Sequence, residues 1–407
     1  TEAFLLERCK GVKLERSPDM SYHAASPGTE KLKHRPVIAG FGPCGMFAGL
    51  ILSELGYEPL ILERGKPIGE RVRDVDRFWS QGILDPESNV QFGEGGAGLF
   101  SDGKLTTQIK DPRVRKVLEE FVAAGCGPEL LYRQKPHIGT DVLRRVVLNI
   151  RKKIVEGGGE ILFQSKLTGL DVDSVGGRGA IRGVVVNGEK RIDAEALVLA
   201  VGHSARDTFR ALNEMGVAME QKPFSIGVRI EHPQSMVNEA QYGASWEDYG
   251  LGAADYKLSH RCENGRGVYT FCMCPGGYVI GASSQEGCVV TNGMSYHDRG
   301  SDLANSALLV DVRTEAFPDE TPLAGIQLQE QYERLAFSAG GSSYHAPVQR
   351  VRDFMNRVRP SEAGCPEARH ESKAQEAAVS RNSALEPTYR PGASWADLSE
   401  CLPGFAV

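Results

Sequence analysis

The sequence predicts an α/β fold, in which a parallel strand–helix–strand domain is joined to a second, β-rich domain of α+β character. Two observations carry this prediction. Over residues 36–63, short apolar runs alternate with a glycine-punctuated helical pattern, which is typical of parallel strands linked by a helix. Beyond Pro223 the apolar runs are separated by Asn-Gly and Pro-Gly-Gly turns, which favour antiparallel hairpins. A chain of 407 residues has room for both domains.

The strand–helix–strand unit carries three glycines directly after its first apolar run, and these are Gly40, Gly42 and Gly45. In this pattern the first glycine permits a tight turn, the second lets the backbone approach a pyrophosphate, and the third lets helix and strand pack closely. The start of the helix offers unpaired N–H groups to phosphates. The second apolar run ends on Glu63, where a carboxylate can accept both ribose hydroxyls. The unit therefore predicts a dinucleotide site.

A second glycine triplet, Gly93, Gly95 and Gly98, has the same spacing. No apolar run precedes it and no apolar run with an acid follows it, so we do not interpret it as a second turn of this kind. At the first site, Glu63 argues against a ribose 2′-phosphate through charge repulsion. The neighbouring Arg64 weakens that argument slightly.

The remaining elements follow in order along the chain. Helices are predicted over 70–81, from the Asp111-Pro112 start to Gly125, and from a capping Thr140 to 155. Short strands are predicted over 161–163, 169–172, 181–186, 191–194 and 197–201, of which the middle ones form a β-meander. In the second domain, strands are predicted over 224–231, 256–260, 267–272, 278–282 and 288–291.

A parallel unit that passes through a β-meander and returns with an apolar strand is the layout of two-domain flavoproteins that bind FAD. The motif order resembles the glutathione-reductase-like superfamily of two-dinucleotide-binding flavoproteins, and more closely a family of FAD-dependent, NAD(FAD)-utilising dehydrogenases. Five segments carry the closer resemblance, from about residue 35 to the end: G-E-G-G-A-G-L-F-S-D-G-K-L (93–105), K-P-H-I-G-T-D (135–141), F-C-M-C-P-G-G (271–277), V-V-T-N-G-M-S (289–295) and A-P-V-Q-R-V-R-D-F (346–354).

The resemblance implies FAD as the cofactor and an oxidoreductase that transfers a hydride or electrons through flavin to or from a small molecule. It implies an N-terminal remnant and linker (1–34), a Rossmann-type FAD-binding domain (35–222), a substrate domain (223–347), and a return segment (348–407) with a flexible insertion at 361–385. The expected cofactor-binding residues are Gly40, Phe41, Gly42, Pro43, Gly45, Glu63, Arg64, Gly95, Gly96, Ala97, Gly98, Leu167 and Gly202.

One departure from the family pattern concerns the end of the chain. Such flavoproteins close the FAD site with a late strand and a Gly-Asp or Gly-Glu-Gly helix start, and no such motif follows residue 350. We therefore expect a truncated chain that binds FAD weakly. No second Rossmann signature for NADPH is found either, so a nicotinamide donor, NADH or NADPH, would dock only transiently.

Three residues are the candidates for chemistry: Lys104, Cys274 and Arg299. Lys104 would place a cation near the flavin N1/O2 edge, or it is a solvated turn lysine. Arg299 could clamp a substrate carboxylate bidentately, or it is a surface residue. Cys274 and Cys272 alternate onto one face of a strand, as a redox pair or, as we favour, as small packing residues.

Two histidines have open roles. His137, at the start of a helix, is a substrate-facing proton donor or a local capping or packing residue. His203, directly after Gly202, lies near the cofactor crevice, where a structural role in the turn is favoured.

Bulk composition excludes several other functions. A net charge of −6 gives no basic surface for nucleic acid, and no apolar run is long enough to cross a membrane. The nine cysteines are scattered without C-x-x-C pairs, so no metal site is predicted and a cytoplasmic location is the simplest interpretation. Two alternatives stay open: an oxidoreductase that uses NAD(P) without flavin, and a non-catalytic nucleotide-binding protein.

Overall fold

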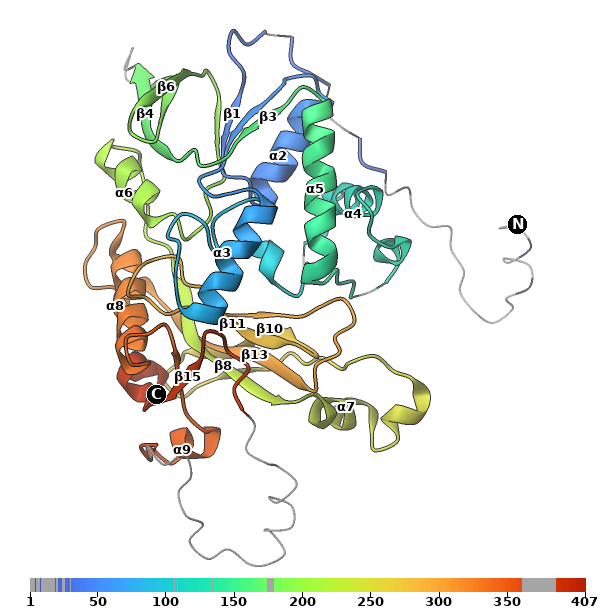
Figure 1. Cartoon of the computed structure of the whole chain (residues 1–407), viewed down its shortest axis with the longest axis vertical. Coiled ribbons are helices and arrows are strands. Elements are labelled where there is room, and N and C mark those ends of the chain that lie inside the picture. The colour runs from blue at the N-terminus through green and yellow to red at the C-terminus, as the bar shows by residue number, and fades with distance from the viewer. Residues whose placement is uncertain are drawn as a thin grey trace, which may run out of the picture.

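The computed structural model describes residues 31–360 and 386–407 except for 106, 108, 134 and 174–178, and in addition residues 4, 8, 19, 21–23 and 26–29. Two layered units lie one above the other (Figure 1), with the chain passing from the upper unit to the lower one between α6 and β8. The predicted division at 222/223 falls in this connection. The α/β prediction is confirmed, because the described residues form one parallel sheet and several antiparallel ones.

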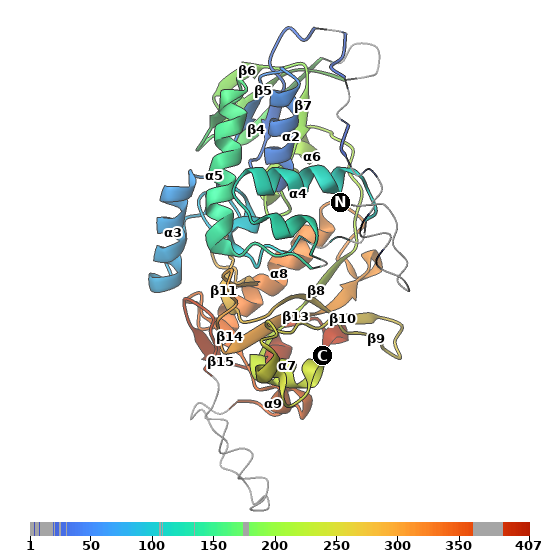
Figure 2. The same ribbon diagram turned by 90° about the vertical axis from the view of Figure 1, so that its right-hand side faces the viewer.

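The parallel sheet has the strand order β3-β2-β1-β7. Its strands are β1 (Val37–Ala39), β2 (Leu60–Leu62), β3 (Glu160–Leu162) and β7 (Leu197–Leu199). Helices α2 (Pro43–Glu54) and α5 (Thr140–Glu156) run side by side along one face of this sheet (Figures 1 and 2). Their apolar faces and the sheet enclose a core that includes Ile38, Leu50 and Ile150. Burial of these side chains, at about 25 cal/mol per Å² of apolar surface, fixes the helices on the sheet.

The β-meander is present where it was predicted. It consists of β4 (Leu167–Asp173), β5 (Ala180–Val186) and β6 (Lys190–Asp193), paired antiparallel. Its inner side chains, Leu167, Val184 and Val186, pack on the sheet face opposite to α2 and α5. The meander thereby leads the chain from β3 back to β7, which pairs parallel to β1 in the centre of the sheet.

Further helices lie between β2 and β8 in the chain, and they are α3 (Ile68–Gln81), η1 (Ala97–Phe100), α4 (Arg113–Ala123), η2 (Pro128–Leu131) and α6 (Arg206–Glu214). The three helices predicted by range agree with α3, α4 and α5 to within two residues. The predicted capping role of Thr140 is wrong, since Gly139 is the N-cap of α5. The Thr140 hydroxyl instead donates to the Leu99 carbonyl and fastens η1 to this helix.

The lower unit is built on an antiparallel sheet of order β8-β13-β10-β9. Its strands are β8 (Phe224–Pro233), β9 (Ser259–Arg261), β10 (Gly267–Cys274) and β13 (Leu303–Val312), with the hairpin β11 (Tyr278–Gly281) and β12 (Thr291–Met294). The sequence analysis placed β12 three residues too early and missed β13. It also missed α7 (Gln234–Tyr242), η3 (Trp246–Tyr249) and α8 (Ala324–Ala339).

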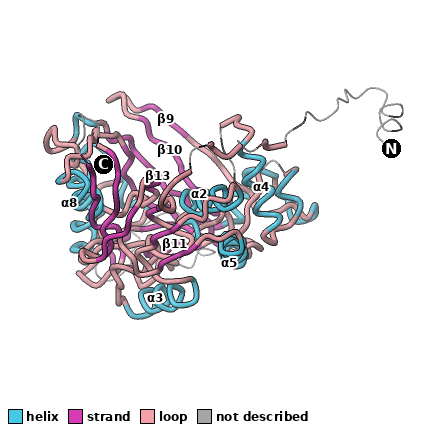
Figure 3. Tube along the Cα trace, turned by 90° about the horizontal axis from the view of Figure 1, so that it is seen from above, coloured by secondary structure: helices cyan, strands magenta, loops and turns pink. Residues whose placement is uncertain are grey.

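The last described segments are η4 (Thr314–Ala316), β14 (Ala346–Val348), α9 (Val351–Met355), β15 (Ala393–Trp395), η5 (Leu398–Cys401) and η6 (Gly404–Ala406). Strands β14 and β15 pair in parallel, and α8 lies at one side of the molecule when it is seen from above (Figure 3). The predicted insertion at 361–385 lies outside the described residues. Among the helices of the described part, none combines the length and the apolar character needed to cross a bilayer.

Candidate functional site

A pocket of about 520 Å³ lies at the carboxyl ends of β1, β2 and β7. The segments that follow these three strands all line it, from Gly40 after β1, Glu63 after β2 and Gly202 after β7. Open α/β sheets bind ligands at this position, where neighbouring strands leave in different directions. The volume lies within the range of 300–1,000 Å³ that is typical of small-molecule sites.

The glycine-rich turn has the geometry that its sequence predicted. Gly40 has a φ of +102°, and a Cβ there would lie 2.3 Å from the Ala200 carbonyl oxygen. A Cβ at Gly45 would lie 1.9 Å from the Gly40 carbonyl oxygen, so this position allows α2 to pack against the turn. Gly42 differs, because a Cβ there would have only ordinary contact, 3.7 Å from Gly96 Cα. Its missing side chain leaves room on the pocket wall rather than relieving a clash.

The opposite wall of the pocket is the second glycine-rich loop, which includes Gly96, Ala97 and Gly98. This loop is held from behind by Arg71 of α3, whose side chain is fully buried. Its guanidinium donates to five carbonyl oxygens, those of Asn89, Val90, Gly93, Glu94 and Gly96, at 2.6–3.3 Å. Burial lowers the pKa of Arg71 to about 10, so the group is still protonated at neutral pH.

The Glu63 carboxylate lines the pocket but is largely occupied by the backbone. It accepts hydrogen bonds of 2.8–2.9 Å from the N–H groups of Phe41, Gly65 and Gly93. An ionised carboxylate has about four acceptor positions, so one is left for a ligand. Glu63 was predicted to accept both ribose hydroxyls, but its remaining acceptor position has room for only one. In the structure its main contacts tie the two glycine-rich loops together.

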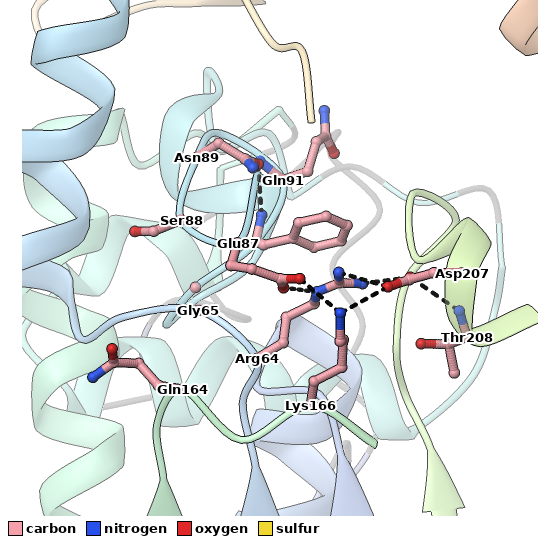
Figure 4. A network of polar contacts seen from close by, with 12 residues as sticks. Arg64, Gly65, Glu87, Ser88, Asn89, Gln91, Gln164, Lys166, Asp207 and Thr208 are labelled. Atoms are coloured by element: carbon pink, nitrogen blue, oxygen red, sulfur yellow. Dashed lines mark hydrogen bonds and ion pairs between the residues drawn. The ribbon is translucent and has the colours of Figure 1, made fainter. Parts of the chain in front are cut away.

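An ion-pair network joins two pocket-lining cations, Arg64 and Lys166, to Glu87 and Asp207 (Figure 4). Arg64 is bidentate to Asp207 at 2.8 and 2.9 Å and lies 2.7 Å from Glu87. Lys166 contacts the same two carboxylates at 2.7 and 3.2 Å. Burial opposes ionisation of Asp207, but hydrogen bonds from Arg64 and Lys166 outweigh it and lower the pKa to about 2. The network connects the end of β2 to the first turn of α6.

The residues of this pocket fit a dinucleotide cofactor. The first turn of α2 offers backbone N–H groups, and the space beside Gly42 is one that a Cβ would fill. At Gly202, φ is +75° and no atom of the described residues lies within 4 Å of a Cβ position, so the backbone there is open to the pocket. Arg64 and Lys166 line one edge of the pocket, where their charges are balanced by Glu87 and Asp207.

The predicted cofactor-binding residues divide into two groups. Those that line the pocket are Gly40, Gly42, Pro43, Glu63, Arg64, Gly96, Ala97, Gly98, Leu167 and Gly202. His203 lines it as well, with Ser204 Oγ 3.2 Å from its Nε2. Phe41, Gly45 and Gly95 do not line it. The Phe41 side chain is fully buried in the core, and Gly95 donates to the Phe41 carbonyl at 2.9 Å.

A second polar cluster surrounds Asp102, just beyond η1, and brings two of the predicted chemical residues together. Arg299 Nη2 lies 2.8 Å and Lys104 Nζ 3.8 Å from Asp102 Oδ2, while the Ser295 hydroxyl donates to Oδ1. Burial raises the pKa of Asp102, but the charges of Lys104 and Arg299 outweigh it, so the carboxylate is held ionised. Arg299 is therefore bound to a carboxylate of the chain itself.

His137 borders this cluster. Its Nε2 lies 2.9 Å from the His297 carbonyl oxygen, and because a carbonyl only accepts, this nitrogen carries the proton. Its ring stacks on that of His297 at a centroid distance of 5.4 Å. Burial and the charge of Arg299 lower the pKa of His137. These contacts are those of a packing residue, the second of the two roles considered for it.

The third chemical candidate, Cys274, lies in β10 next to Cys272, and both are free thiols. Sequence reasoning missed several neighbours of this cluster and of the pocket, namely Arg71, Asp102, Arg229, His297 and Asn305. Asp102 lies in the quoted motif at 93–105. The others had no detectable signal, because each acts through contacts with residues distant in the sequence.

Comparisons with known proteins match the C-terminal part of the chain to a family and the whole chain to a relative. Residues 223–407 match the family described as "FAD-dependent protein, C-terminal domain-like". An uncharacterised protein of Clostridium beijerinckii is 47% identical over 407 residues, which are 100% of the chain and 72% of that protein. The chain belongs to this family of FAD-dependent proteins. The prediction of FAD as the cofactor is thereby confirmed at the level of the family.

Three solved structures show more distant likeness. THI4 of Thermovibrio ammonificans is 18% identical over 46% of the chain and 66% of its own, with a TM-score of 0.32. The L-amino acid deaminase of Proteus vulgaris is 16% identical over 52% of the chain and 56% of its own, with a TM-score of 0.26. The halogenase PltM is 12% identical over 73% of the chain and 55% of its own, with a TM-score of 0.33. The chain spans less than two thirds of the length of these structures, and TM-scores this low carry no argument.

Proposed function

We propose that the protein is an FAD-dependent oxidoreductase with a Rossmann-type FAD site. The observation that carries this proposal is the pocket at the carboxyl ends of β1, β2 and β7, with its opening beside Gly42. The ADP half of FAD would be held by the turn at Gly40–Gly42, by the start of α2 and by the backbone at Gly202. The second glycine-rich loop, at Gly96–Gly98, would face the flavin half.

FAD, when bound, supplies two-electron or hydride transfer, which side chains cannot perform. The residues of the chain bind and orient it. Arg71 keeps the Gly96–Gly98 wall in place, and Glu63 joins this wall to the first glycine turn. Lys104 carries a positive charge just beyond this loop, in keeping with the role considered for it from sequence.

The proposed substrate is a small molecule, and the proposed electron donor or acceptor includes NADH or NADPH docking transiently. A cytoplasmic location fits the unpaired cysteines among the described residues. Two other functions compete with this one, a nicotinamide-dependent enzyme without flavin and a protein that binds a nucleotide without catalysis.

Titration of the purified chain with FAD, followed by flavin fluorescence, tests the cofactor site. Gly42→Ala is the informative variant, since its Cβ makes only ordinary contacts and should not disturb the fold. We expect the dissociation constant for FAD to rise by about tenfold or more, equivalent to ~1.4 kcal/mol, because the methyl group occupies the approach to the pyrophosphate. Gly69→Ala, in the exposed part of α3 with open space around it, is the matched control.

Equal FAD affinity in the Gly42→Ala variant and in the control would contradict the proposed site. Catalysis is tested separately, by adding candidate donors, NADH and NADPH among them, to the FAD-loaded chain without oxygen and recording the visible spectrum. Bleaching of the flavin band supports an oxidoreductase. Tight FAD binding with no bleaching by any donor supports the non-catalytic alternative, and binding of NAD(P) with no affinity for FAD supports the nicotinamide-dependent one.

A further inference from the structure

Two thiols lie two residues apart in β10, where the strand departs from regular pairing. Phe271 pairs with Ala307 and Cys274 with Asn305, so β10 contains one residue more than β13 in this interval. Cys272 lies in this β-bulge with a φ of +47°, a conformation that L-residues rarely adopt. Bulges and strained backbone of this kind occur frequently next to functional sites. Simple packing of small side chains requires neither feature.

The two thiols differ in exposure. Cys272 is partly accessible, whereas Cys274 is fully buried. The Cys274 thiol donates to the Cys272 carbonyl oxygen at 3.3 Å, which places it beside Cys272. An accessible sulfur with a buried thiol beside it is the arrangement of an attacking cysteine and its resolving partner.

Cationic side chains surround the accessible thiol. Arg229 of β8 reaches the Cys272 carbonyl oxygen at 3.4 Å and donates to the Asn305 side chain. The Lys104 ammonium is buried at its tip and has no hydrogen-bond partner within the described part of the chain. The neighbouring Cys274 thiol lowers the pKa of Cys272, and Lys104 and Arg229 lower it further against the effect of burial. The neighbouring Cys272 thiol and burial raise the pKa of Cys274.

We propose that Cys272 and Cys274 form a redox-active dithiol that reacts with small, negatively charged disulfides. The Cys272 thiolate attacks one sulfur of the disulfide, forming a mixed disulfide and releasing one thiolate. Cys274 then loses its proton and attacks the Cys272 sulfur, which closes the intramolecular disulfide and releases the second thiolate. The two protein thiols are oxidised by two electrons, and the substrate is reduced to two thiols.

The choice of an anionic disulfide follows from the charges around the pair. Lys104, Arg229 and Arg299 face two carboxylates among the described neighbours, Asp102 and Glu231. Because three positive charges outnumber two negative ones, carboxylate-bearing disulfides would be attracted. A disulfide closed between residues i and i+2 departs from ordinary geometry and is easily reduced again, as a reversible redox site requires.

Glutathione disulfide is the probe for the first experiment, with the full-length chain reduced, freed of reductant and examined by tryptic mass spectrometry. We expect loss of two hydrogens in the peptide 267–299, located by fragmentation to Cys272 and Cys274. Cys274→Ser should retain one glutathione on Cys272. A wild-type chain that keeps glutathione on Cys272 without closing the bond, or that reacts only at Cys44 and Cys262, would overturn the proposal. No flavin is needed, so this result is independent of the FAD site.

The second experiment leaves both thiols in place and measures the pH dependence of alkylation by iodoacetamide. For Cys272 we expect a midpoint below that of an ordinary cysteine thiol in the wild-type chain. Lys104→Met should raise this midpoint by about one unit, since it removes a nearby cation and keeps the shape of the side chain. Lys135→Met, which removes an exposed lysine paired with Asp255, should not change it. The proposed effect of the cations on Cys272 would be refuted by a wild-type alkylation midpoint of Cys272 no lower than that of Cys262. Equal shifts of this midpoint in Lys104→Met and Lys135→Met would refute it as well.

Discussion

Single residues explain how the glycine-rich walls of the pocket keep their shape. Arg71 is the clearest case, because one side chain satisfies five main-chain carbonyls of the loop that precedes η1. A buried carbonyl without a partner costs about 1–3 kcal/mol. The loop therefore depends on Arg71 for its conformation, although Arg71 itself does not line the pocket.

Arg71→Met should destabilise the whole chain strongly, since it leaves several buried carbonyls unpaired. We expect a loss of roughly 3 kcal/mol or more in the free energy of unfolding, seen as a large fall in melting temperature. Arg73→Met, at an exposed position of the same helix, is the control and should change stability by less than about 0.5 kcal/mol. Similar melting temperatures for both variants would show that the carbonyls find other partners.

The first glycine turn could be predicted from single residues, whereas the Arg71 contacts that hold the second glycine-rich loop could not. Gly40 is required by its φ of +102°, and Gly45 by its contact with the Gly40 carbonyl, so the spacing of the two glycines carries the information. Arg71 contacts carbonyls 18–25 residues further along, and nothing in its own neighbourhood indicates burial. Glu63 was predicted as a site residue, but its main hydrogen-bond partners were not. Two of the three N–H groups that it accepts from, those of Phe41 and Gly93, lie in other loops.

At the scale of helices and strands, an element could be predicted from the sequence where its apolar residues recur at regular intervals. The meander strands alternate apolar and polar residues and were found in order. The central strand β13 was missed, since Asn305 and Ser306 are fully buried polar residues that interrupt its apolar pattern. Helix α8 was missed for a related reason. Only Ala324 and Leu328 of its sixteen residues are buried, so its apolar stripe is short.

Helix α6 is fastened to the pocket by Asp207, and Asp207→Asn tests this connection. The variant removes the bidentate partner of Arg64 and one partner of Lys166. We expect a loss of about 1 kcal/mol in the free energy of unfolding, because the Asp207 side chain is partly exposed to solvent. Melting temperatures of both proteins over a range of pH measure it.

The pH dependence of this difference follows from the pKa of Asp207. Its folded value, about 2, lies below the ordinary value near 3.9, so the contribution is complete above pH 4 and is lost as the pH falls through 2. The difference between wild type and Asp207→Asn should therefore be the same at pH 7 and pH 4.5 and should shrink between pH 4 and pH 2. A difference that stays constant down to pH 2 would mean that folding does not lower the pKa of Asp207. Asp173→Asn, in an exposed pair with Arg182, serves as the control.

At the scale of the whole molecule, a few contacts join the upper and lower units. Trp79 of α3 donates to the Gly281 carbonyl of β11 at 2.9 Å, and the cluster at Asp102 binds Ser295 and Arg299. Arg206 of α6 forms a bidentate ion pair with Glu333 of α8, at 2.6 and 2.8 Å, with both side chains largely buried. Such contacts between distant parts of the chain could not be predicted from local sequence patterns.

Glu333→Ala tests whether this ion pair couples the two units. Among the described residues, removing Glu333 leaves the Arg206 guanidinium largely buried, hydrogen-bonded to the side-chain amides of Gln285 and Gln329 and with Glu330 as the remaining nearby carboxylate. An uncompensated buried charge costs about 3–5 kcal/mol, so we expect a clear fall in melting temperature. Because α6 directly follows the pocket-lining segment at Gly202, we also expect weaker FAD binding, measured by the fluorescence titration used for Gly42→Ala.

The exposed ion pair of Lys135 and Asp255 provides the comparison for Glu333→Ala. Its side chains are 67% and 36% accessible, and pairs of this kind contribute about 0–1 kcal/mol. Asp255→Ala should therefore leave melting and FAD affinity nearly unchanged. If Glu333→Ala lowers the melting temperature without affecting FAD binding, the ion pair stabilises the lower unit alone. If it affects both, the pair links the stability of the lower unit to the geometry of the pocket.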